Sequence, residues 1–162
     1  MYYEVYVSSD IKFTDFEFDG ITYKYVASKF SNGVVAPKNT QGIRVTSLER
    51  TVVDSIKDFE KIGGLEELLN CISLVHYLDE KQLIAYLNAY NLHFLYQKTG
   101  FILGHYKNEL QISDEFIDYC KRKINKSTRY LTKDNGTYYS EWKLVVPNDF
   151  FGITEQGGTP LV

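Results

Sequence analysis

The order of hydrophobic and polar positions predicts strands near the start of the chain, helices in its middle and strands again near its end. Residues 2–7 alternate in polarity, and aromatic and aliphatic residues alternate from Phe16 to Tyr25 on both sides of Asp19-Gly20. An Asp-Gly pair accepts the positive φ angles of a two-residue hairpin turn. We therefore predict a strand and then a hairpin, with a further short strand over residues 43–45.

The first predicted helix begins at residue 46. Thr46 and Glu49 have the spacing of a capping box, in which each side chain accepts a hydrogen bond from the backbone of the other. Apolar residues then recur at helical spacing, at Leu48, Val52, Val53, Ile56 and Phe59. This pattern predicts an amphipathic helix whose polar side chains, including those of Arg50 and Asp54, face the solvent.

Four further amphipathic helices complete the middle of the chain. Capping residues and apolar periodicity place them over residues 65–75, after Asp79, over 92–103 and after Asp114. Gly63-Gly64 separates the first helix from the second, because paired glycines favour a helix end. Gly100 lies inside the fourth segment, which we expect to be bent or shortened there.

The last strands are predicted over 129–132 and 137–146, as a hairpin around Asp134-Asn135-Gly136 that Pro147 closes. The predicted fold is α+β, with mostly antiparallel strands at the two ends of the chain and a central cluster of four to five helices. We predict a single domain over residues 1–162. Its parts are a strand and hairpin region (1–45), a helical region (46–127), a hairpin (128–147) and a tail (148–162).

Composition excludes some classes of function but does not identify the function of the chain. The chain has 162 residues and a net charge of −3, so it has no overall attraction to nucleic acid and any such binding must be local. It has no apolar run near the length of a membrane span and no signal-peptide pattern, which predicts a cytoplasmic protein without a membrane partner. Cys71 and Cys120 both lie among helix-periodic apolar residues and are predicted to be reduced core residues.

Two charge patterns are candidates for contact with a partner or with DNA. The first is a basic run with no acidic residue inside it, formed by Lys121, Arg122, Lys123, Lys126, Arg129 and Lys133. It is either a patch for DNA phosphates or an acidic partner, or a solvated helix end followed by a basic turn. The second is Arg50 with Asp54, four residues apart, which form either an ordinary helical pair or a contact with a partner.

Enzymatic chemistry has one candidate set of residues. Asp134, Glu141 and Lys143 superficially resemble the acidic pair and lysine of metal-dependent nucleases, and Glu141 and Lys143 share one face of the predicted strand. The three histidines are far apart in sequence and have no motif partner. We therefore predict no catalytic residues, no metal site and no cofactor, and keep the nuclease as an alternative.

The segment Arg44-Val45-Thr46-Ser47-Leu48-Glu49-Arg50-Thr51-Val52-Val53-Asp54 resembles the signature of AbiEi-type antitoxins of bacterial abortive-infection, or type IV toxin-antitoxin, systems. The paired strands before it resemble those that open the C-terminal domain of that family. The segments Gly63–Leu69 and Gln97–Leu103 resemble its later helices. The resemblance covers residues 2 to about 146.

The resemblance implies an antitoxin and transcriptional regulator in phage defence. Family members join an N-terminal winged helix-turn-helix, which binds the promoter, to a C-terminal domain needed for antitoxin activity. The toxin is a nucleotidyltransferase, and a stable complex with it is not implied. This sequence begins with the first strand of the C-terminal domain, so we expect only auxiliary contact with promoter DNA. A structural dimerisation domain is the other alternative.

Overall fold

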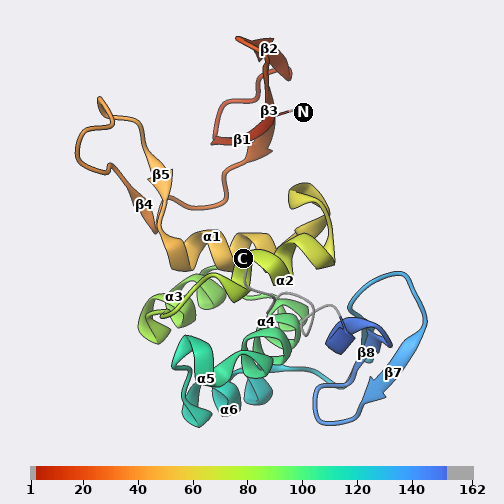
Figure 1. Cartoon of the computed structure of the whole chain (residues 1–162). Coiled ribbons are helices and arrows are strands. Elements are labelled where there is room, and N and C mark those ends of the chain that lie inside the picture. The colour runs from red at the N-terminus through yellow and green to blue at the C-terminus, as the bar shows by residue number, and fades with distance from the viewer. Residues whose placement is uncertain (1–2, 153–162) are drawn as a thin grey trace, which may run out of the picture. The chain divides into compact units, whose positions relative to one another are not determined.

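The computed structural model describes residues 3–152 and has the predicted mixture of helices and strands (Figure 1). Strands lie towards both ends of the chain and helices between them, which confirms the α+β class. Three of the five strand pairings are antiparallel and two are parallel. The chain divides into two compact units, residues 1–32 and 33–162. The single domain proposed for the whole chain stays a prediction.

The first unit is a three-stranded sheet. It consists of β1 (Tyr3–Ser9), β2 (Phe16–Phe18) and β3 (Ile21–Ala27), in the order β1-β3-β2. The β2-β3 hairpin turns at Asp19 and Gly20, whose φ angles are 51° and 74°, as the Asp-Gly pair predicted. β1 lies parallel to β3. The predicted strand and hairpin are therefore confirmed.

The second unit begins with a small hairpin. β4 (Val34–Val35) pairs antiparallel with β5 (Val45–Thr46). β5 overlaps the strand predicted over 43–45, whereas β4 was not predicted. The helices follow as α1 (Leu48–Lys57), a 3-10 turn (Phe59–Ile62), α2 (Leu65–Ser73), α3 (Glu80–Tyr90), α4 (His93–His105), α5 (Lys107–Leu110) and α6 (Asp114–Lys123).

Helix α4 is the centre of the second unit. Every residue from Leu95 to Leu103 is buried, so this helix is covered on all sides, and it packs against α1, α5 and α6 (Figure 1). The break predicted at Gly100 is absent from α4, which continues to His105. A Cβ atom at Gly100 would lie 2.3 Å from the Trp142 ring. The glycine therefore makes room for the tryptophan instead of bending the helix.

The last sheet differs from the predicted hairpin. It contains β6 (Arg129–Tyr130), β7 (Gly136–Tyr139) and β8 (Leu144–Pro147), in the order β6-β8-β7. β6 pairs parallel with β8 and not with β7, and the continuous strand predicted over 137–146 is interrupted by a turn at residues 140–143. Gly136 belongs to β7, where a Cβ atom would lie 1.9 Å from the Val146 carbonyl oxygen. β8 ends at Pro147 as predicted.

Two side chains, those of Cys71 and Phe150, lie where the sequence did not place them. Cys71 is exposed on α2, in contrast to the core position predicted for it, whereas Cys120 is fully buried as predicted. Phe150 belongs to the segment predicted as a tail, yet it is buried and its ring packs 5.3 Å from that of Phe101. The predicted tail residues 153–162 lie outside the described residues. No helix of residues 3–152 is long and apolar enough to cross a membrane.

Candidate functional site

The start of α1 differs by one residue from the predicted capping box. Ser47 is the N-cap, and its hydroxyl oxygen accepts a hydrogen bond from the Arg50 backbone at 3.3 Å. Thr46 instead pairs its hydroxyl with that of Thr51 at 2.6 Å. The Glu49 carboxylate accepts from the backbone N–H of Asp79 at 3.1 Å, which ties α1 to the start of α3. Leu48 is the first residue of the helix and is exposed, so it is not in the core as predicted.

Arg50 and Asp54 form a cluster with Tyr90 of α3. The Arg50 side chain is only 4% exposed, so the solvent-facing position predicted for it is wrong. Its Nε donates to both Asp54 carboxylate oxygens, at 3.0 and 2.9 Å, and the Tyr90 hydroxyl donates to Asp54 Oδ1 at 2.5 Å. Burial, together with the neighbouring Asp54 carboxylate, raises the pKa of Tyr90 to about 12. The ion pair between Arg50 and Asp54 therefore joins α1 to α3 through Tyr90.

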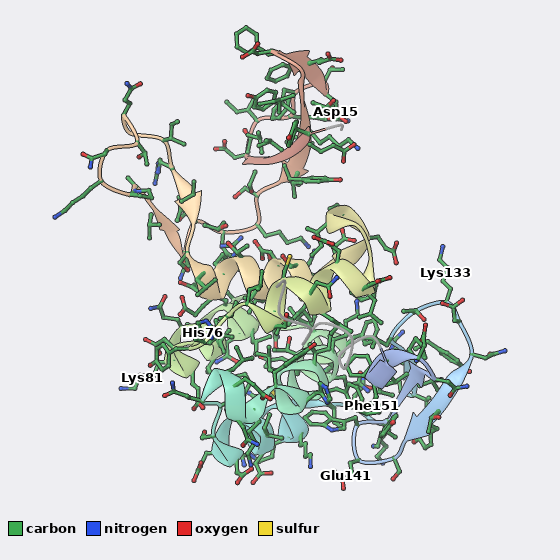
Figure 2. The ribbon with its side chains drawn as sticks, in the orientation of Figure 1. Asp15, His76, Lys81, Lys133, Glu141 and Phe151 are labelled. Carbon is green, nitrogen blue, oxygen red and sulfur yellow. The ribbon has the colours of Figure 1, made fainter. Side chains whose placement is uncertain are left out.

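The predicted basic run is divided among several environments. Lys121 forms an ion pair with Glu141 at 2.8 Å, and its Nζ lies 5.3 Å from the centre of the Trp142 ring. Arg122 and Lys123 are exposed and approach the Tyr119 ring at 6.0 and 5.3 Å. The remaining members are Lys126 and Lys133, both exposed, and Arg129, which approaches Phe94 of α4. Figure 2 shows Lys133 and Glu141 well apart, beyond opposite ends of β7.

The three residues of the nuclease alternative have separate partners. Glu141 pairs with Lys121, whose hydrogen bond lowers the pKa of that carboxyl group. Lys143 donates to the Asn125 carbonyl oxygen at 3.4 Å, and the Asp134 carboxylate accepts from Thr132 at 3.3 Å. Glu141 and Lys143 lie in the turn before β8, so the shared strand face predicted for them is wrong. Within residues 3–152, no group of three or more His, Cys, Asp or Glu side chains could hold a metal ion.

A pocket of about 500 Å³ lies where the end of α1, the start of α4 and the segment after α6 meet. Its lining residues are Lys57, Asn91, Leu92, His93, Phe94, Leu95, Lys98, Asn125 and Arg129. None of them is acidic, and three are basic, namely Lys57, Lys98 and Arg129. Arg129 is the one member of the predicted basic run among them. The pocket is the candidate functional site.

Lys98 is the most unusual residue of this basic pocket. It is 8% exposed, and its Nζ donates to the Ile56 and Lys57 carbonyl oxygens at 3.4 Å each. The same Nζ lies 4.6 Å from the centre of the Phe59 ring and 4.7 Å from that of Phe94. Burial lowers the pKa of Lys98 because a charged amine is poorly solvated there.

Sequence reasoning missed Lys98 and the pocket around it. The one signal in the sequence was that Lys98 is the only charged residue in the largely apolar segment 94–103. A single lysine in a helix is ordinarily exposed, so this signal did not predict a buried lysine. Lys57 connects this pocket to the α1-α3 cluster, since its Nζ lies 5.3 Å from the centre of the Tyr90 ring. The His93 ring nitrogen Nδ1 is 2.6 Å from the Lys123 carbonyl oxygen, which holds the start of α4 beside the end of α6.

Comparisons of the chain with protein-family models, with curated proteins and with solved structures found no match. The residues themselves define two features of the second unit. One is helix α1 with its N-cap Ser47, because Ser47, Glu49, Arg50 and Asp54 contact α3 or the residue that caps it. The other is the basic pocket at the far end of the same helix.

Proposed function

We propose that this chain is a binding module of the AbiEi antitoxin type, which counteracts a nucleotidyltransferase-like toxin and assists regulation of its own promoter. The support is the resemblance over residues 44–54 together with the role of those residues in the fold. Glu49 bonds the Asp79 backbone, and Arg50 and Asp54 bond Tyr90. Because these polar groups hold α1 against α3, we expect the surface that acts on the partner to lie elsewhere on the molecule.

A binding role is favoured over the nuclease alternative by the placement of three side chains. A metal-dependent nuclease needs its carboxylates directed at a common ion. Here Glu141 is paired with Lys121, and Asp134 accepts from Thr132 on the loop before β7. Incubation of a plasmid with the chain and Mg²⁺ or Mn²⁺ tests this directly. Cleavage that Glu141→Ala abolishes would favour the nuclease.

Auxiliary contact with DNA is assigned to the end of α6. Arg122 and Lys123 close this helix and Lys126 follows it, and all three are exposed. Contacts between such side chains and phosphates weaken as salt rises, because bound cations are released from the DNA. A gel shift with promoter DNA at rising salt concentrations measures this. Replacement of Arg122, Lys123 and Lys126 by glutamine should remove the shift, and an unchanged shift would exclude this surface.

Antitoxin activity is tested by growth. Cells that express the neighbouring nucleotidyltransferase-like gene should recover when the 162-residue chain is supplied. Val53→Asp is a suitable negative control, since Val53 is fully buried and an aspartate there prevents folding. The dimerisation alternative stays a prediction, which sedimentation at high protein concentration would test.

A further inference from the structure

We propose that the basic pocket between α1, α4 and the segment after α6 binds a nucleotide, with Lys57, Lys98 and Arg129 holding its phosphate groups. This inference concerns a ligand of the chain itself and goes beyond the proposed antitoxin function, on which it does not depend. It is carried by the cavity, by the charges that line it and by the partners that those charges have.

The charges of the pocket lack a carboxylate. Among residues 3–152, the ion pairs use Lys24, Arg50, Lys61, Lys107 and Lys121. The lysines and the arginine of the pocket contact carbonyl oxygens and aromatic rings instead. Arg129 lies 5.9 Å from the centre of the Phe94 ring, Lys57 approaches Tyr90, and Lys98 approaches two rings and two carbonyl oxygens. Only Lys98 is removed from water, and the nearby Asp58 and Glu60 carboxylates act on its charge without forming an ion pair with it. Lys57 is half-buried and Arg129 is exposed, so both can reach a bound phosphate, whose negative charge would balance the three cations.

Lys98 is held in place before any ligand arrives. Its Nζ is fixed by the last carbonyl groups of α1 and by the Phe59 and Phe94 rings. These partners position the amine at the pocket wall without neutralising it. A ligand therefore loses little entropy in ordering this side chain, which favours affinity.

The remaining lining residues suit the rest of a nucleotide. Leu92, Phe94 and Leu95 supply apolar surface for a base, while the amide groups of Asn91 and Asn125 can both donate and accept hydrogen bonds at its edge. Lys98 and Arg129 lie over the Phe94 ring, so the cationic and apolar parts of the wall are adjacent. A nucleotide joins an anionic part to an aromatic part in the same way.

The size of the pocket excludes the simplest alternative. A volume of about 500 Å³ is far more than one phosphate ion fills, and it lies within the range of about 300–1,000 Å³ that is typical of small-molecule sites. An acidic peptide would need a longer groove along the surface. The first turn of α4 lies at the pocket wall, and its positive end adds to the attraction for an anion.

The test is isothermal titration of the 162-residue chain with ATP, GTP, AMP, inorganic phosphate, tripolyphosphate and a glutamate hexapeptide. We expect saturable binding of at least one nucleotide. Arg129→Ala should weaken it by about tenfold or more, as the loss of one charged contact to phosphate does. Lys133→Ala is the matched control, because Lys133 is exposed, basic and outside the pocket, and it should leave the affinity unchanged.

Lys98→Met separates a ligand role from a structural one. Methionine keeps most of the length of the side chain and removes the buried charge, so binding should be lost, while the circular dichroism spectrum shows whether the variant is still folded. The proposal is overturned if no nucleotide binds at millimolar concentration, or if Arg129→Ala and Lys98→Met bind as the parent chain does. It is also overturned if tripolyphosphate or the hexapeptide binds as tightly as the nucleotides. The growth assay does not depend on any of these outcomes. The nucleotide-binding proposal and the antitoxin proposal can therefore be refuted independently of each other.

Discussion

Replacement of Gly100 by alanine tests the packing at the centre of the second unit. Gly100 lies inside α4, where alanine is favoured over glycine by about 1 kcal/mol on helix propensity alone. The structure predicts the opposite sign. A Cβ atom at this position would lie 2.3 and 2.4 Å from two atoms of the Trp142 ring and 2.8 Å from Cys120 Cβ.

The magnitude follows from how far the ring must move. Carbon atoms in contact lie about 3.5 Å or more apart, so Trp142 must shift by roughly 1 Å. The Trp142 side chain is buried, and its carbonyl oxygen is held by Gln97 Nε2 at 3.0 Å. Overpacking of this kind costs about 1–3 kcal/mol and more where the neighbours are fixed. Contacts this short place the cost at the upper end of that range, about 3 kcal/mol, and with the propensity gain of about 1 kcal/mol subtracted we expect Gly100→Ala to destabilise the fold by about 2 kcal/mol.

Urea unfolding followed by tryptophan fluorescence measures this effect, because Trp142 is the only tryptophan in the chain. The matched control is Gly104→Ala in the same helix. There the nearest atom is the tip of the Ile117 side chain at 3.3 Å, which can move, so the helix propensity should dominate and the variant should be as stable as the parent or more so. If Gly100→Ala proves as stable as Gly104→Ala, the packing of Trp142 against α4 is wrong.

Two further predictions concern charges and protons. Asp54→Asn should lower the free energy of unfolding by about 1–3 kcal/mol, because it weakens the hydrogen bonds of buried Arg50. Asp58→Asn breaks an exposed ion pair with Lys61 and should lower the free energy of unfolding by less than about 1 kcal/mol. Equal urea midpoints for Asp54→Asn and Asp58→Asn would contradict this difference. Burial raises the pKa of Tyr96 and Tyr106 from 10.0 to about 12, so their contribution to stability is present below pH 10.0 and is lost as the pH rises towards 12. Urea midpoints measured across this range should fall, and a constant midpoint would count against the burial of both phenols.

The helices could be predicted because their signals are local. Asp79 caps α3 through the Lys81 and Gln82 backbone N–H groups, and Ser113 caps α6, which begins at the predicted Asp114. The Asp19-Gly20 turn is also local, since the two residues adopt the required φ angles without help from the rest of the fold.

The remaining features depend on residues far apart in sequence. Gly100 was interpreted as a bend because its neighbour in space, Trp142, is remote in the chain. The parallel pairing of β6 with β8 has no sequence signal, since a turn motif between strands predicts a hairpin. The pocket joins Lys57, Lys98 and Arg129 from three segments, and no periodicity brings such residues together.

Antitoxin activity is measured without interference from promoter regulation when the toxin is expressed from a foreign promoter and rescue of growth is scored. Under this design, repression of the native promoter cannot account for recovery, so growth reports antitoxin activity alone. The account predicts that the 162-residue chain restores colony formation and that Val53→Asp does not. Continued toxicity in the presence of the folded chain, shown to be expressed at a matched level, would contradict the antitoxin assignment.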